Sequence, residues 1–217
     1  MSDSTSKVVL YSYFRSTCSA RVRIALNYKR IQYTQTHINL LEKKNKTCEY
    51  ANKSPTQFVP LLEIDGLDLI ESAAILEYLE ETRPEPALLP KEPAQRAKVR
   101  VIMSIIGCGI QPLQNNSQLA LYPAEARAER AATVIRNGFS GLEKYLSKVS
   151  GLYSVGSQLS IADVYLYPMC HAAQRYNVQI EDYPTIFRIF HELSLLEPFI
   201  NGAWFMQEDC PDELKQA

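Results

Sequence analysis

The fold is decided by the stretch Val8-Val-Leu-Tyr-Ser-Tyr-Phe-Arg-Ser-Thr-Cys-Ser-Ala-Arg-Val-Arg-Ile-Ala-Leu26. Its first six residues are rich in β-branched and aromatic side chains, which favour a strand. In residues 18–29 the apolar side chains recur at helical spacing. Ser16, Thr17 and Cys18 therefore lie at a strand-to-helix turn, where unpaired amides and the helix dipole favour an anion.

The signals that follow complete a small mixed domain. Residues 32–38 are strand-like, and the polar, Lys-rich residues 39–53 indicate an exposed loop or a short helix. Asp65-Gly66 stands between two apolar runs, which predicts a hairpin. We expect Ser72 to cap a helix that ends at the proline-rich run 82–86. The predicted order over residues 1–86 is βαβ, a loop, then ββα.

The second part of the chain, residues 87–217, gives only helical signals. Amphipathic patterns with polar or glycine breaks between them predict helices over 93–121, 124–149 and 161–176. Ser160-Ile-Ala-Asp163 has the form of a capping box, with a hydroxyl at the N-cap and a carboxylate three residues later. We therefore predict the α+β class, with an all-helical second domain.

Composition excludes several function classes. The 217 residues carry 23 Lys+Arg against 24 Asp+Glu, a net charge of -1, which argues against a nucleic-acid partner. The first residues lack an apolar signal segment, and no stretch is apolar for long enough to span a bilayer, so we expect a cytoplasmic protein without a membrane partner. Five cysteines without a CxxC pair and three scattered histidines indicate reduced thiols and no metal site.

The turn at Ser16 to Cys18 offers thiol chemistry. A helix N-terminus lowers the pKa of a thiol, and a serine hydroxyl donates a hydrogen bond to a sulfur anion. Taken alone, such a cluster is also typical of an ordinary N-cap. Two other element starts, Val59-Pro60 and Glu71-Ser72, belong to the same domain and are expected to converge on it. A cis proline after Val59 would turn the Val59 backbone toward a peptide-like ligand.

Ser16-Thr-Cys-Ser-Ala-Arg-Val-Arg-Ile-Ala-Leu26 closely resembles the signature Ser-Ser-Cys-Ser-x-Arg-Val-Arg-Ile-Ala-Leu of the zeta-class glutathione transferases. The resemblance covers nearly the whole chain, and further matching motifs are Tyr78-Leu-Glu-Glu-Thr-Arg-Pro84, Leu88-Leu-Pro90, Gly109-Ile-Gln-Pro-Leu-Gln-Asn115 and Ala162-Asp163. It implies a thioredoxin-like first domain that binds glutathione, a helical second domain that completes the substrate pocket, and a homodimer.

The resemblance also implies roles for single residues. Ser16 matches the serine that activates the glutathione thiol, Cys18 the cysteine important for isomerisation, and Arg175 an arginine of the electrophile pocket. The other positions that match glutathione contacts are Thr17, Ser19, Ala20, Arg21, Val59, Glu71, Ser72, Gln111, Asn115, Asn116 and Ser117. The chain departs from its relatives at Thr17 and Glu71, where they commonly have serine and glutamine, and at Phe58, where many have a polar residue.

The activity that the resemblance implies is the glutathione-dependent cis/trans isomerisation of maleylacetoacetate to fumarylacetoacetate in phenylalanine and tyrosine degradation, with glutathione transfer to small electrophiles. Two alternatives remain open. Cys18 suits a monothiol redox enzyme of the dehydroascorbate reductase kind, since the chain lacks the second cysteine of a dithiol motif. The same fold also serves non-catalytic proteins that bind apolar ligands or a partner.

Overall fold

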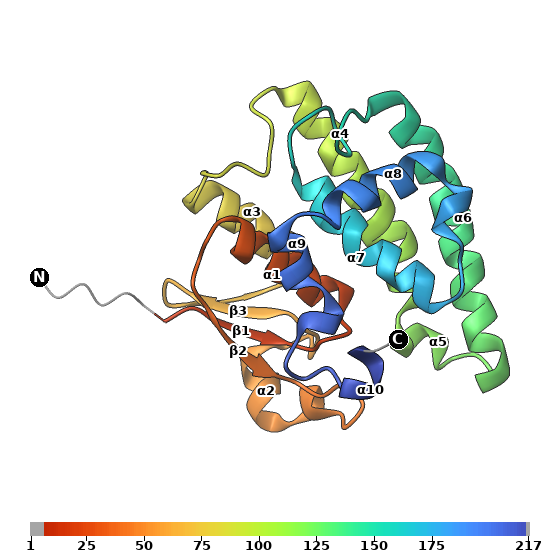
Figure 1. Cartoon of the computed structure of the whole chain (residues 1–217). Helices are drawn as coiled ribbons and strands as arrows, with labels where there is room; N and C mark the ends of the chain where they lie inside the picture. Colours follow the sequence, from red (N-terminus) through yellow and green to blue (C-terminus); the bar gives the residue numbers. More distant parts are fainter. Residues whose placement is uncertain (1–6, 216–217) are drawn as a thin grey trace, which may run out of the picture. The chain divides into compact units, whose positions relative to one another are not determined.

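The computed structural model describes residues 7–215 and divides the chain into two compact units. The first unit contains residues 7–86 together with 197–215, and the second unit runs from Ala87 to Leu196. The division after Pro86 falls where the sequence places it, but the last segment packs with the first unit, whereas the sequence assigned it to the helical domain. Figure 1 shows α9 (Glu197–Gly202) beside α1 (Thr17–Tyr28). Gly202 permits this close approach, because a Cβ there would overlap Ile24.

The first unit is built on a four-stranded mixed sheet with the order β2-β1-β3-β4. The strands are β1 (Val9–Ser12), β2 (Thr34–His37), β3 (Leu61–Ile64) and β4 (Leu67–Ile70). Strand β1 pairs parallel with β2 and antiparallel with β3. The predicted Asp65-Gly66 hairpin joins β3 to β4, and both turn residues have positive φ, 53° and 78°. This is the backbone geometry that an Asp-Gly pair favours.

Helices α1 and α3 supply the apolar partners of the sheet. Leu10 and Leu62 from the strands, Ile24 from α1 and Ile75 from α3 are fully buried. The C-terminal end of α1 is fixed by Lys29, whose ammonium is 2.8 Å from the Glu80 carboxylate. The helices of this unit are α1, α2 (Cys48–Lys53), α3 (Ser72–Thr82), α9 and α10 (Asp212–Lys215), with 3-10 turns η1 (Lys44–Lys46) and η6 (Trp204–Met206). The predicted βαβ-ββα order is confirmed.

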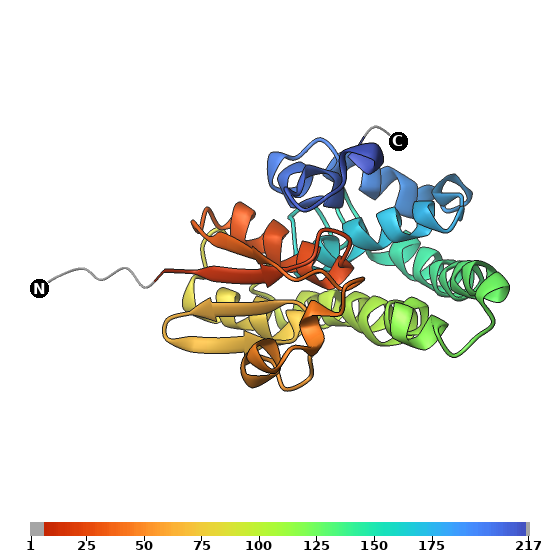
Figure 2. The same ribbon diagram turned by 90° about the horizontal axis from the view of Figure 1, so that it is seen from below.

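The second unit consists of helices and connecting loops (Figure 1 and Figure 2). Its helices are α4 (Pro93–Ser104), α5 (Asn116–Leu119), α6 (Arg127–Val149), α7 (Ile161–Arg175) and α8 (Pro184–Leu193), with short turns η2 (Ile105–Ile110), η3 (Pro112–Gln114), η4 (Ala124–Ala126) and η5 (Ile180–Asp182). The single helix predicted over 93–121 is wrong. It becomes π-helical at η2 and then breaks, because two glycines weaken the helix there and Pro112 lacks an amide.

The predicted capping box at the start of α7 is confirmed. The fully buried Asp163 carboxylate accepts the backbone amides of Ser154, at 2.8 Å, and Ser160, at 2.9 Å. Burial raises the pKa of Asp163, while these hydrogen bonds oppose the rise. The box therefore fixes both the start of α7 and the loop before it. No helix within residues 7–215 is long and apolar enough to cross a membrane.

Candidate active site at the start of the first helix

Ser16 is the N-cap of α1, which begins at Thr17, one residue earlier than the periodicity places the helix start. Its extended backbone, with φ -72° and ψ 117°, turns its hydroxyl oxygen back over the helix, where it accepts the Ser19 amide at 3.1 Å. The Ser16 amide donates to the Tyr13 carbonyl at 3.0 Å and closes the turn. A hydroxyl oxygen that accepts one bond still has its proton to donate. Ser16 thus offers a donor beside the free amides of the first turn.

Cys18 and Ser72 are brought together by one buried arginine. The Arg21 guanidinium, 3% exposed, lies with Nη1 3.7 Å from the Cys18 sulfur and 3.2 Å from the Ser72 hydroxyl oxygen. Cys18 is the second residue of α1 and Ser72 the first of α3, so the two helix starts face the same cation.

Val59 lies next to the turn that carries Ser16. The predicted cis bond between Val59 and Pro60 is present, and Glu85-Pro86 is a second cis bond that the sequence did not indicate. Val59 is buried in one apolar cluster with Tyr13 and Phe14. It therefore lies beside the Ser16 turn, as the expected convergence requires.

Glu71, rather than Ser72, is the N-cap of α3. Its φ of 67° and ψ of 114° place a residue with a full side chain in a region that mainly glycine adopts. Strain of this kind costs on the order of 1–3 kcal/mol and is concentrated at functional sites. The Glu71 side chain is exposed and makes no capping bond, so its carboxylate is open to a cationic group of a ligand.

A cavity of about 150 Å³ lies beside the same turn. Its lining includes the polar or charged residues Arg15, His37, Asn39 and Asp209, and the complete lining is Tyr13, Phe14, Arg15, His37, Asn39, Leu41, Asp209, Pro211 and Leu214. The Arg15 guanidinium rests 5.7 Å from the centre of the Phe14 ring. Sequence reasoning missed this lining, because its three segments are far apart in the chain. The one available signal was that Arg15 directly precedes Ser16.

The site residues expected in the second unit belong to two segments of the chain. Gln111, Asn115, Asn116 and Ser117 follow the π-helical η2 in one short segment, and π-helical turns are frequent at functional sites. Gln111 is buried, whereas Asn116 and Ser117 are exposed. Arg175 is the last residue of α7 and is exposed, with its guanidinium 5.1 Å from the Tyr176 ring centre.

Known proteins are similar to this chain in sequence and in fold. Residues 10–87 match the family described as Glutathione S-transferase, N-terminal domain, and residues 125–194 match Glutathione S-transferase, C-terminal domain. Maleylacetoacetate isomerase from Mus musculus is 47% identical over 211 residues, which cover 96% of this chain and 98% of that protein.

Two solved structures are also similar. A maleyl pyruvate isomerase, described as a bacterial glutathione S-transferase of the zeta class, is 34% identical with a TM-score of 0.90 over 94% of this chain and 100% of that one. Maleylacetoacetate isomerase from Anaeromyxobacter dehalogenans 2CP-1, with glutathione bound in its active site, is 35% identical with a TM-score of 0.86 over 94% and 98% of the two chains.

The chain belongs to the glutathione S-transferase family. Its mixed sheet with a capped, thiol-bearing helix start, its helical second unit and the matches to both family domains agree on this. Within that family the chain belongs to the zeta class, as the motif at Ser16 to Leu26 predicted.

Proposed function

We propose that this chain is a glutathione-dependent isomerase that converts maleylacetoacetate to fumarylacetoacetate in phenylalanine and tyrosine degradation. The observation that carries the proposal is the start of α1, where the Ser16 hydroxyl caps the helix and the Arg21 guanidinium donates to Cys18. The Mus musculus and Anaeromyxobacter dehalogenans relatives bear the name of this enzyme. Transfer of glutathione to small electrophiles is a second reaction of the same site.

Glutathione fits the residues at this site. Its thiol belongs at Ser16, its peptide backbone beside Val59, and its zwitterionic γ-glutamyl end at Glu71 and Ser72, where an exposed carboxylate for the ammonium and a helix start for the carboxylate lie together. We assign the remaining contacts to Thr17, Ser19, Ala20, Arg21, Gln111, Asn115, Asn116 and Ser117. When bound, glutathione supplies the thiolate that adds reversibly to the cis double bond of the substrate, so that rotation about a single bond becomes possible.

The chain itself must stabilise anions in two places. Ser16 donates its hydroxyl proton to the thiolate sulfur, and the free amides of α1 add their dipoles. The substrate is a dianion, so its carboxylates need cations, which arginine provides with paired donors. We assign this role to Arg175 and to Arg15, whose guanidinium lines the cavity beside Ser16. Cys18 acts on the substrate side.

The test is an assay of purified protein on maleylacetoacetate with and without glutathione. We expect Cys18→Ala to lower the isomerisation rate by at least about tenfold, which corresponds to about 1.4 kcal/mol of transition-state stabilisation, with little change in glutathione affinity. Cys48→Ala, which removes an exposed thiol from α2, is the matched control and should keep full activity.

Two results would contradict the proposal. One is full isomerase activity in Cys18→Ala. The other is a wild-type protein that reduces mixed disulfides of glutathione faster than it isomerises the diketone, since addition to a double bond leaves thiols unoxidised whereas disulfide exchange cycles them. The second result would favour the monothiol redox enzyme.

We further propose that the protein is a homodimer in the cytoplasm, which the resemblance to the zeta class implies. Sedimentation equilibrium of the full chain measures the oligomeric state directly. A monomer across the working concentration range would contradict the dimer.

A further inference from the structure

The turn before Ser16 is held by a fully buried arginine. The Arg23 guanidinium, from the second turn of α1, donates to the Ser12 hydroxyl at 2.8 Å, to the Gly202 carbonyl at 2.9 Å, and to the carbonyls of Phe14, at 3.1 Å, and Tyr13, at 3.4 Å. Among residues 7–215 no carboxylate lies within ion-pair distance of it. Burial lowers the pKa of Arg23 to about 10.

A buried cation that meets only neutral oxygens is costly to keep. Three of the four acceptors of Arg23 belong to residues 12–14, directly before the Ser16 turn. An apolar side chain of similar size would fill the same space without removing a charge from water. We therefore infer that the charged Arg23 side chain serves to fix the backbone conformation of residues 12–14.

Asp209 holds the opposite side of the same turn. One of its carboxylate oxygens accepts the Phe14 amide at 2.9 Å. The Tyr13 carbonyl and the Phe14 amide are the two ends of one peptide group, so this peptide has a guanidinium at its oxygen and a carboxylate at its nitrogen. The Tyr13 oxygen also accepts the Ser16 amide at 3.0 Å. Any rotation of the peptide would break a charged bond on each side and release Ser16.

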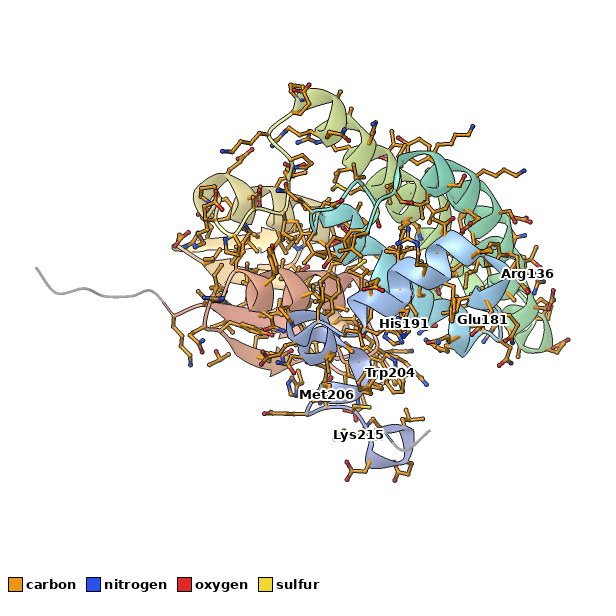
Figure 3. All side chains as sticks on the ribbon, turned by 45° about the horizontal axis from the view of Figure 1, so that its top comes forward. Arg136, Glu181, His191, Trp204, Met206 and Lys215 are labelled. Carbon is orange, nitrogen blue, oxygen red and sulfur yellow. The ribbon has the colours of Figure 1, made fainter. Side chains whose placement is uncertain are left out.

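We propose that Arg23 and Asp209 are positioning residues that clamp the Tyr13–Phe14 peptide between them and thereby direct the Ser16 hydroxyl. Asp209 comes from the C-terminal segment between the labelled Met206 and Lys215 (Figure 3). Through Asp209, the C-terminal segment thus fixes the turn that carries Ser16. This inference rests on the proposed role of Ser16 as the donor to the glutathione thiolate.

Asp209→Asn is the sharpest test, because it keeps the size and one acceptor oxygen but removes the charge. We expect kcat to fall about tenfold, and the midpoint of thiolate formation in the glutathione complex to rise by about one pH unit. Asp212→Asn is the matched control, since Asp212 lies on the same segment, is exposed and pairs with Lys215, and it should leave both readouts unchanged.

A purely structural role predicts a different pattern. In that case Asp209→Asn would lower the denaturation midpoint while the folded variant titrated its bound glutathione like the wild type, and this result would overturn the inference. Ser12→Ala removes one acceptor of Arg23 without removing the cation, and we expect a smaller shift of the thiolate midpoint in the same direction. An unchanged thiolate midpoint in both Asp209→Asn and Ser12→Ala also overturns the inference. Both variants keep the Arg23 side chain, so the test does not depend on whether Arg23→Lys folds.

The thiolate titration needs no electrophile. A wild-type protein that binds glutathione but does not isomerise maleylacetoacetate would overturn the proposed function, and the titration of Asp209→Asn would still decide this inference.

Discussion

Two helices of this protein begin with a serine cap, and the two caps are built for different purposes. At the start of α7, Ser160 is 1% exposed and its hydroxyl donates to the buried Asp163 carboxylate, which closes the site completely. At the start of α1, Ser16 is half-buried, and the residue three positions later is Ser19, which has no carboxylate. A serine cap therefore stabilises the fold at α7, where its polar groups are paired and buried. At α1 the cap leaves the Ser16 hydroxyl proton unused, and we propose that this proton is donated to the glutathione thiolate.

The largest expected effect is on the closed cap. Asp163→Ala would leave the buried amides of Ser154 and Ser160 without acceptors, so we expect the free energy of unfolding to fall by about 3–5 kcal/mol. Urea denaturation of the purified variant measures this loss. Asp163→Asn keeps the shape and one acceptor and should lose less. A loss below about 1 kcal/mol in Asp163→Ala would show that the box is no more than an ordinary cap.

At the open cap of α1 we expect a substitution to change the pKa of the bound thiol more than the stability of the fold. Ser16→Ala removes the hydroxyl oxygen that accepts the Ser19 amide, and we expect the free energy of unfolding to fall by only about 1 kcal/mol. The pKa of the bound glutathione thiol should rise by about one unit or more, because a hydrogen bond to a charged group contributes roughly 1.5–3 kcal/mol. Activity should fall most near neutral pH and recover partly in alkali, since the helix amides remain.

Thiolate absorbance of the glutathione complex, titrated against pH, measures this shift. Thr17→Ala is the matched control at the next hydroxyl and should move the midpoint much less. A larger shift in Thr17→Ala than in Ser16→Ala would assign the activating role to Thr17.

The last expected effect is a pH dependence of the stability of α7. His171 on α7 packs edge-on against the rings of Tyr167 and Phe190, and burial lowers its pKa to about 4. The unfolded chain, with a histidine pKa near 6.5, therefore takes up a proton first as the pH falls. Stability should decrease from about pH 6.5 down to about pH 4, by about 1–3 kcal/mol in total, since His171 is not fully enclosed.

Urea denaturation at about pH 7 and about pH 4.5 tests this loss in the wild type and in His171→Phe, which keeps the ring packing. The variant should lose the dependence in this window. His191→Gln, which changes an exposed histidine on α8, controls for the loss of a histidine. An equal acid loss in wild type and His171→Phe would place the titrating group elsewhere.

Local patterns predicted the parts of the fold that local chemistry decides. Asp65-Gly66 specified its hairpin and Ser160-Ile-Ala-Asp163 its capping box, because each signal and its structural partner lie within a few residues. The start of α1 was predictable for the same reason. The break at η2 was not predicted, because helical periodicity continues through Ile105 and only the later Pro112 marks the end.

Long-range pairings left no such signal. The contact between Phe14 and Asp209 joins residues 195 positions apart, and Arg23 looked like any polar residue on an amphipathic helix. The backbone conformation of Glu71 was equally hidden, since a glutamate gives no indication of positive φ. The candidate site residues of the first unit were predicted from motifs, while the groups that hold them in place required the structure.

The return of residues 197–215 to the first unit has a consequence for synthesis of the protein. On the ribosome, the sheet, α1 and the whole of the second unit emerge before Asp209 does. Until then the Phe14 amide has no carboxylate to meet, and Arg23 has no Gly202 carbonyl. A nascent chain can therefore fold its strands early, but the turn before Ser16 gains these two contacts only after Gly202 and Asp209 have left the exit tunnel.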